Sequence, residues 1–120
     1  MDRLNVPPDK YSISFQSRLG KGWLQPFTDI RLQELPKEGI KNLLILCPSF
    51  VSDCLETLEE IDERGRVIYK KAGGENLIMI PCLNTHPMWV RTLAGWINEF
   101  AAGNTEMILD NEPQQVKSEQ

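Results

Sequence analysis

Three acidic side chains recur at spacings of three and four residues in the middle of the chain: Asp53, Glu56 and Glu60. On a helix these spacings place the carboxylates along one face, where like charges on neighbouring turns repel each other. A shared proton or cation offsets that repulsion, so such a row can relay protons or conduct a divalent metal that prefers oxygen ligands. Asp53 and Glu56 also fit a capping box, and on spacing alone capping is the simpler interpretation.

The acidic residues around Glu60 have a second interpretation, as an ordinary solvated helix face. Four basic side chains follow closely and can offset them: Arg64, Arg66, Lys70 and Lys71. Elsewhere, Trp23 lies in a glycine-rich loop before Pro26, where it can line an apolar pocket for a flat aromatic ligand or cover part of the core. His86, the only histidine, precedes Pro87 and is predicted to cap a helix rather than bind a ligand.

Three predicted strands alternate with three predicted helices and must position these residues. Large and small side chains alternate from Tyr11 to Ser17, which is typical of a strand, whereas the continuous apolar run from Asn42 to Cys47 indicates a strand covered on both faces. A third, short apolar strand spans Leu77 to Ile80. This order predicts an α/β fold with parallel strands in a Rossmann-like, three-layer sheet.

The first predicted helix begins at Thr28-Asp29 and is stopped by Pro36, and the second runs from Ser52 or Asp53 to about Lys71, closed by Gly73-Gly74. The third opens at residues 85–87, and its predicted buried side consists of Trp89, Leu93, Trp96, Ile97 and Phe100. Ligands of such sheets bind beyond the carboxyl ends of the strands. Segments 17–23, 48–56 and 82–85 are therefore predicted to form the site.

The bulk composition excludes several functional classes. The 120 residues, 41% of them hydrophobic and 25% charged, predict one globular domain over residues 1–103 and a polar, disordered tail over residues 104–120. A net charge of -4 without a basic cluster argues against nucleic acid as a partner, and the longest apolar stretch is far shorter than the roughly 20 residues of a membrane span. The three widely spaced cysteines are predicted to be small buried residues of a cytoplasmic protein rather than metal ligands.

The string CPSFVSDCLETLEEID, from Cys47 to Asp62, closely resembles the catalytic helix motif of bacterial ferrochelatases. Four further blocks similar to that family occur in the right order: SFQSRLG, WLQP followed by TD, GIKNL and LN. Together they cover about residues 8 to 100. The resemblance implies a chelatase-like fold of two similar Rossmann-like domains with a porphyrin between them, of which this chain is an incomplete second domain, the C-terminal half.

The resemblance also implies residue roles. Glu56 resembles the catalytic glutamate and metal contact of the family, Glu60 the next carboxylate on that helix, and Asp53 a flanking acid, while Trp23 and Phe50 resemble aromatic residues near the macrocycle. Carboxylates can accept the two N–H protons that protoporphyrin loses when ferrous iron enters, a reaction of the last steps of heme biosynthesis. Iron is then a substrate. No permanently bound cofactor is expected, and no iron–sulfur cluster, because a C-terminal cysteine cluster is lacking.

Three departures from the family pattern set further expectations. Cys54 stands where many relatives carry histidine, and Arg64 where many carry a third carboxylate. The first domain and the essential histidine of the family lie upstream of the residues present, so the chain alone is expected to be inactive, and to pair with the missing half or to self-associate. Two alternatives stay open: a chelatase for cobalt or another tetrapyrrole, and a porphyrin-binding or assembly module without turnover.

Overall fold

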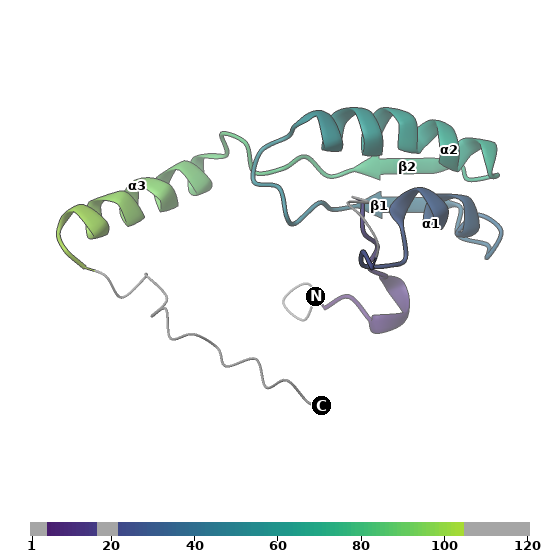
Figure 1. Ribbon diagram of the computed structural model, residues 1–120, viewed down its shortest axis with the longest axis horizontal. Coiled ribbons are helices and arrows are strands. Elements are labelled where there is room, and N and C mark those ends of the chain that lie inside the picture. Colours follow the sequence, from purple (N-terminus) through teal and green to yellow (C-terminus); the bar gives the residue numbers. More distant parts are fainter. Residues whose placement is uncertain (1–4, 17–21, 105–120) are drawn as a thin grey trace. The chain divides into compact units, whose positions relative to one another are not determined.

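The structure, a computed structural model, describes residues 5–16 and 22–104 (Figure 1). The described residues divide into two compact units, one up to Cys82 and one from Leu83. Ser17, which ends the first predicted strand, lies outside the described residues, as does the predicted tail beyond Asn104. Among the described residues no helix is long and apolar enough to cross a membrane.

The first unit is a mixed α/β structure built on two parallel strands. Strands β1 (Asn42–Ile45) and β2 (Asn76–Met79) pair in register from Asn42 opposite Asn76 to Ile45 opposite Met79. The remaining elements are a 3-10 helix η2 (Pro8–Lys10), helix α1 (Thr28–Glu34), π-helix η3 (Glu56–Arg64) and helix α2 (Gly65–Lys71). The long second helix predicted from the sequence is confirmed as η3 followed directly by α2, and it connects the two parallel strands.

The core lies between the helices and one face of the strand pair. Leu32 of α1, Tyr69 of α2 and Leu77 of β2 form its buried centre. The Tyr69 side chain is completely buried, and its hydroxyl donates to the Ile40 carbonyl oxygen at 2.8 Å. Since the same cluster includes Ile45 of β1, it fixes the sheet relative to α1 and α2, and so fixes the direction in which η3 leaves the carboxyl end of β1.

The opposite face of the strand pair is not covered by the described residues. Leu44 is 65% exposed, and three further side chains of alternating positions are 40–53% exposed: Leu46, Ile78 and Ile80. The expectation that β1 is covered on both faces therefore fails for the described part of the chain, where the helices form one layer rather than two. A continuous apolar run identifies a strand suited to burial but does not specify whether the covering element belongs to the same segment of chain.

The predicted strand from Tyr11 is wrong over the residues that the structure describes. Only Phe15 makes a β-bridge, to Phe27, and Ile13 is exposed. The alternating pattern is present, but the segment pairs with the residue that precedes α1 instead of with β1. A strand needs a neighbour of comparable length, and this segment has none among the described residues.

Helix α3 (Pro87–Ala101) belongs to the second unit. The His86 side chain caps it by accepting a hydrogen bond from the Met88 N–H at 3.3 Å, as predicted. The predicted burial of its apolar side is wrong within this unit, because α3 buries none of its residues. Trp89 and Trp96 instead contact each other edge to face, with 5.8 Å between ring centroids.

Candidate active site

The buried hydroxyl of Thr57 organises the start of η3. Thr57 is completely buried, its Oγ1 accepts a hydrogen bond from the Cys54 N–H at 2.9 Å, and the same hydroxyl lies 3.1 Å from the Cys54 carbonyl oxygen and 3.3 Å from Asp53 Oδ1. Free backbone donors at a helix start need such partners. Thr57 therefore fixes the turn that carries Glu56.

Asp53 joins two loops at the carboxyl ends of the strands. Its Oδ1 atom lies within hydrogen-bond distance of the Thr57 hydroxyl, and it accepts the Cys82 N–H at 3.2 Å. Cys82 follows β2, whereas Asp53 follows β1, so the carboxylate ties together the segments 48–56 and 82–85 that the sequence assigned to the site. These contacts give Asp53 a structural function beside the acid function implied by the family resemblance.

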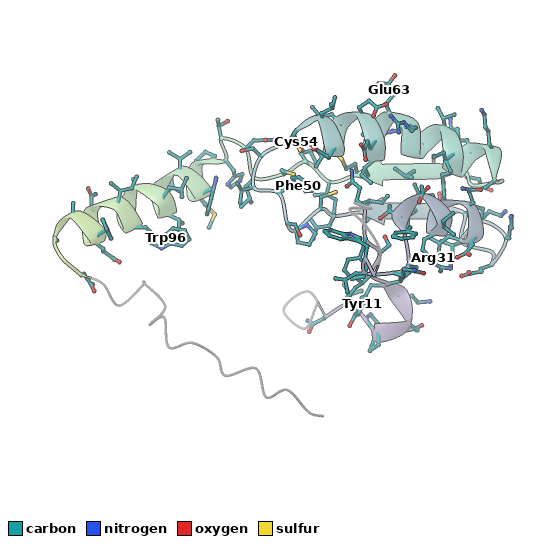
Figure 2. All side chains as sticks on the ribbon, viewed as in Figure 1. Tyr11, Arg31, Phe50, Cys54, Glu63 and Trp96 are labelled. Carbon is teal, nitrogen blue, oxygen red and sulfur yellow. The ribbon has the colours of Figure 1, made fainter. Side chains whose placement is uncertain are left out.

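Glu56 presents an exposed carboxylate beyond the carboxyl end of β1. The Cys54 thiol and the Glu56 backbone N–H both donate hydrogen bonds to it, and they lower its pKa from the ordinary value. Glu56 is consequently ionised at neutral pH. Figure 2 labels Cys54 and Phe50, which both lie on the connection that leads from β1 to η3.

Glu56 and Glu60 share one hydrogen-bond donor, which the sequence interpretation missed. Gln16 Nε2 donates to the Glu56 carbonyl oxygen at 2.7 Å and to Glu60 Oε2 at 3.0 Å. Because η3 is a π-helix, whose turns are wider than those of an α-helix, residues four apart lie close to the same line along its surface. Gln16 therefore lies beside the Glu56 backbone and the Glu60 side chain, and the alignment of the two carboxylates stays a prediction.

Two of the four basic residues named by the solvated-face interpretation, Arg64 and Arg66, pair with acidic residues of η3. Arg64 makes a two-pronged contact with Glu59, at 2.7 and 2.8 Å from its Nη2 atom, and Arg66 pairs with Asp62. Three acidic residues of η3 therefore differ in the charge of their partners. Glu59 and Asp62 are neutralised by arginines, whereas Glu60 contacts the uncharged amide of Gln16.

Two of the three cysteines, Cys47 and Cys82, have thiols whose pKa is raised above the ordinary value. Burial, reinforced by the Asp53 carboxylate, raises the pKa of Cys82 to about 11 and also raises the pKa of Cys47. All three thiols are free and half-buried. Within the described ranges no group of three or more His, Cys, Asp or Glu side chains is arranged to hold a metal ion.

The two aromatic candidates lie on loops and do not stack on each other. Trp23 is 37% exposed and Phe50 is half-buried. The close ring pair in the described part of the chain joins Trp89 and Trp96 instead. Residues 17–21, which belong to the first predicted ligand-binding segment, lie outside the described residues. Of that segment, the structure describes Gly22 and Trp23.

The arrangement defines a class of site: an ionised carboxylate at the carboxyl edge of a parallel α/β sheet, with further carboxylates on the same connection and helix. A family model described as Ferrochelatase matches residues 1–101. The chain belongs to the ferrochelatase family.

Individual ferrochelatases support this assignment. The chain is 55% identical over 94 residues to the ferrochelatase of Pseudomonas entomophila (strain L48), covering 78% of this chain and 28% of that protein. It is 57% identical over 93 residues to the ferrochelatase of Pseudomonas putida (strain W619), covering 77% and 28%. The chain thus spans little more than a quarter of the length of the curated relatives it matches.

Proposed function

We propose that this chain forms the carboxylate-bearing part of a ferrochelatase, which inserts ferrous iron into protoporphyrin in the last steps of heme biosynthesis. The observation that carries the proposal is the position of Glu56 in a chain of this family. Its carboxylate is exposed, its pKa is lowered by a hydrogen bond from the Cys54 thiol, and it stands at the start of the helix that follows the carboxyl end of β1. Substrates of parallel α/β sheets bind at that edge.

The chemistry requires a proton acceptor beside an apolar surface. As ferrous iron bonds to the four nitrogens of the porphyrin, two N–H bonds break and two protons must leave. Glu56 accepts the two protons one after the other at its carboxylate and passes each to Glu60, which releases it to water, and the freed Glu56 carboxylate contacts the incoming iron. Trp23 and Phe50 border the macrocycle face, where apolar side chains favour a flat ring over water.

The rest of the enzyme completes the sheet and the site. Leu44, Leu46, Ile78 and Ile80 form an apolar face that the described residues leave open, which supports a three-layer, chelatase-like domain covered there by a further part of the enzyme. On this proposal iron and porphyrin are substrates, no cofactor is permanently bound, the protein acts in the cytoplasm, and the 120-residue chain alone lacks turnover.

A substitution of Glu56 tests the proposal in an assembly of this chain with the upstream part of the Pseudomonas entomophila ferrochelatase. Glu56→Gln keeps the shape and removes the acceptor charge, so we expect iron insertion to fall at least a hundredfold, the usual contribution of a general base. Glu63→Gln is the matched control, because Glu63 is an exposed residue of the same helix on its outer side (Figure 2). An E56Q assembly that inserts iron as fast as E63Q refutes the assignment.

A non-catalytic porphyrin-binding module is the second candidate, favoured by the partly exposed aromatic side chains of Trp23 and Phe50 on loops. Porphyrin titration of the same assembly separates the two, since binding without insertion of any divalent metal supports the module. A panel of iron, cobalt and zinc with protoporphyrin and a more reduced tetrapyrrole distinguishes ferrochelatase from a cobalt chelatase, because oxygen ligands alone do not select among these ions.

A further inference from the structure

The side-chain amide of Gln16 binds two residues of the carboxylate row at once. One nitrogen, Nε2, serves both the Glu56 carbonyl oxygen and the Glu60 carboxylate, at 2.7 and 3.0 Å. Both acceptors are oxygen atoms, so a group with two N–H donors fits between them, whereas a carboxylate in the place of the amide has no such donor. Gln16 and Glu60 are 44 positions apart, and the contact therefore holds η3 against a distant segment of the chain.

Gln16 is presented from a fixed position beside α1. The preceding residue, Phe15, donates its N–H to the Pro26 carbonyl oxygen at 2.8 Å and accepts the Thr28 N–H at 3.0 Å. The hydroxyl groups of Ser14 and Thr28 are also hydrogen-bonded, at 2.9 Å. Because Thr28 is the buried first residue of α1, the helix that packs on α2 also fixes the backbone that carries Gln16.

Glu60 has a competing partner within reach of the same space. Gln16, Glu60 and Arg64 are among the residues that line a cavity of about 130 Å³ between α1 and η3. The Arg64 guanidinium is held by Glu59 at present, but it also attracts the Glu60 carboxylate electrostatically. A Glu60 side chain released from Gln16 has room to turn into this cavity, where a charge-assisted hydrogen bond to Arg64 would retain it.

We infer that Gln16 is a positioning residue of the carboxylate row: it holds Glu60 on the side of η3 that carries the Glu56 carbonyl and prevents its capture by Arg64. Proton transfer from Glu56 to Glu60 then depends on Gln16, although Gln16 itself exchanges no proton. The effect on turnover rests on the proposed function, whereas the placement of Glu60 does not.

The placement of Glu60 is tested in the 120-residue chain by NMR of its side-chain carboxyl carbon. Gln16→Met removes both N–H donors at similar volume, so Glu60 should turn to Arg64 in the Q16M variant. Arg64→Ala should therefore shift the Glu60 carboxyl resonance strongly in the Q16M background, where Arg64 is its partner. In the wild-type background, where Gln16 is its partner, the shift should be weak. Gln33→Met is the matched control, since the Gln33 amide is exposed and donates to the Asp29 carbonyl oxygen at 3.1 Å. Equal effects of R64A in both backgrounds overturn the inference.

The effect on turnover is tested in the assembly with the upstream part of the relative. We expect Q16M to lower kcat about tenfold with the porphyrin KM unchanged, because a hydrogen bond to a charged group is lost from the proton-transfer step only. Q16M/R64A should recover most of that loss, while R64A and Q33M alone stay within about twofold of wild type.

The two measurements fail separately. A Q16M loss that R64A does not relieve, or that raises KM as much as it lowers kcat, indicates a merely structural residue and overturns the inference. If the wild-type assembly inserts no iron, the proposed function fails, and the NMR comparison still decides whether Gln16 controls the position of Glu60.

Discussion

Replacing Thr57 with valine should destabilise the chain by about 2 kcal/mol, because valine keeps the shape of the side chain and removes its hydroxyl. The Cys54 N–H, which donates to that hydroxyl at 2.9 Å, then lacks its partner beside a completely buried side chain. An unsatisfied buried donor costs roughly 1–3 kcal/mol. Asp53 loses the same neighbour, so the connection between the two loops is weakened as well.

The prediction is checked by urea unfolding. A small domain has a slope of about 1–2 kcal/mol per molar urea, so a loss of 2 kcal/mol lowers the midpoint by about 1–2 M. Thr57→Ser keeps the hydroxyl and loses one methyl group, and should cost about 1 kcal/mol. Thr92→Val is the control, because its exposed hydroxyl donates to the Met88 carbonyl oxygen without serving a buried donor. A T57V midpoint equal to that of T57S refutes the reasoning.

The remaining predictions concern the site and its missing surroundings. Cys54→Ala should raise the pKa of Glu56, because the thiol that donates to its carboxylate is removed. In the wild type the lowered Glu56 pKa stabilises the folded state above the ordinary carboxyl pKa, and this stabilisation is lost as the pH falls through the Glu56 pKa. An NMR titration of Glu56 that is the same in both proteins contradicts the prediction. Trp23→Phe should remove most of the tryptophan quenching caused by porphyrin, and undiminished quenching by Trp89 and Trp96 excludes Trp23 as a contact. The chain alone should self-associate in size-exclusion chromatography and insert no iron, and an active monomer contradicts both statements.

The sequence predicted the helices and the two short strands, because their helix-ending residues and apolar patterns favour the same structure as the packing does. Gly73, with a φ of 97°, ends α2 as expected, and Pro36 follows the end of α1. The contacts that organise the site were not predictable in this way. Gln16 and Glu60, or Asp53 and Cys82, are brought together by tertiary packing over 44 and 29 positions, and nothing in their local spacing indicates the pairing.

The open face of the strand pair explains why the fold and the function of this chain depend on what covers it. Leu44 of β1 lies opposite Ile78 of β2, and both remain more than half exposed. Full burial of a fully exposed side chain of this kind contributes about 1.5–3 kcal/mol. The four open aliphatic side chains are about half exposed, so covering them adds roughly 3–6 kcal/mol, a large part of the total stability of a small domain. Parallel strands rarely persist with one face in water. A partner that covers this face should therefore stabilise the same strands whose carboxyl ends carry Glu56, and assembly and activation should occur together. If the upstream part of the relative restores insertion but leaves the urea midpoint of the chain unchanged, the two are not coupled through this face.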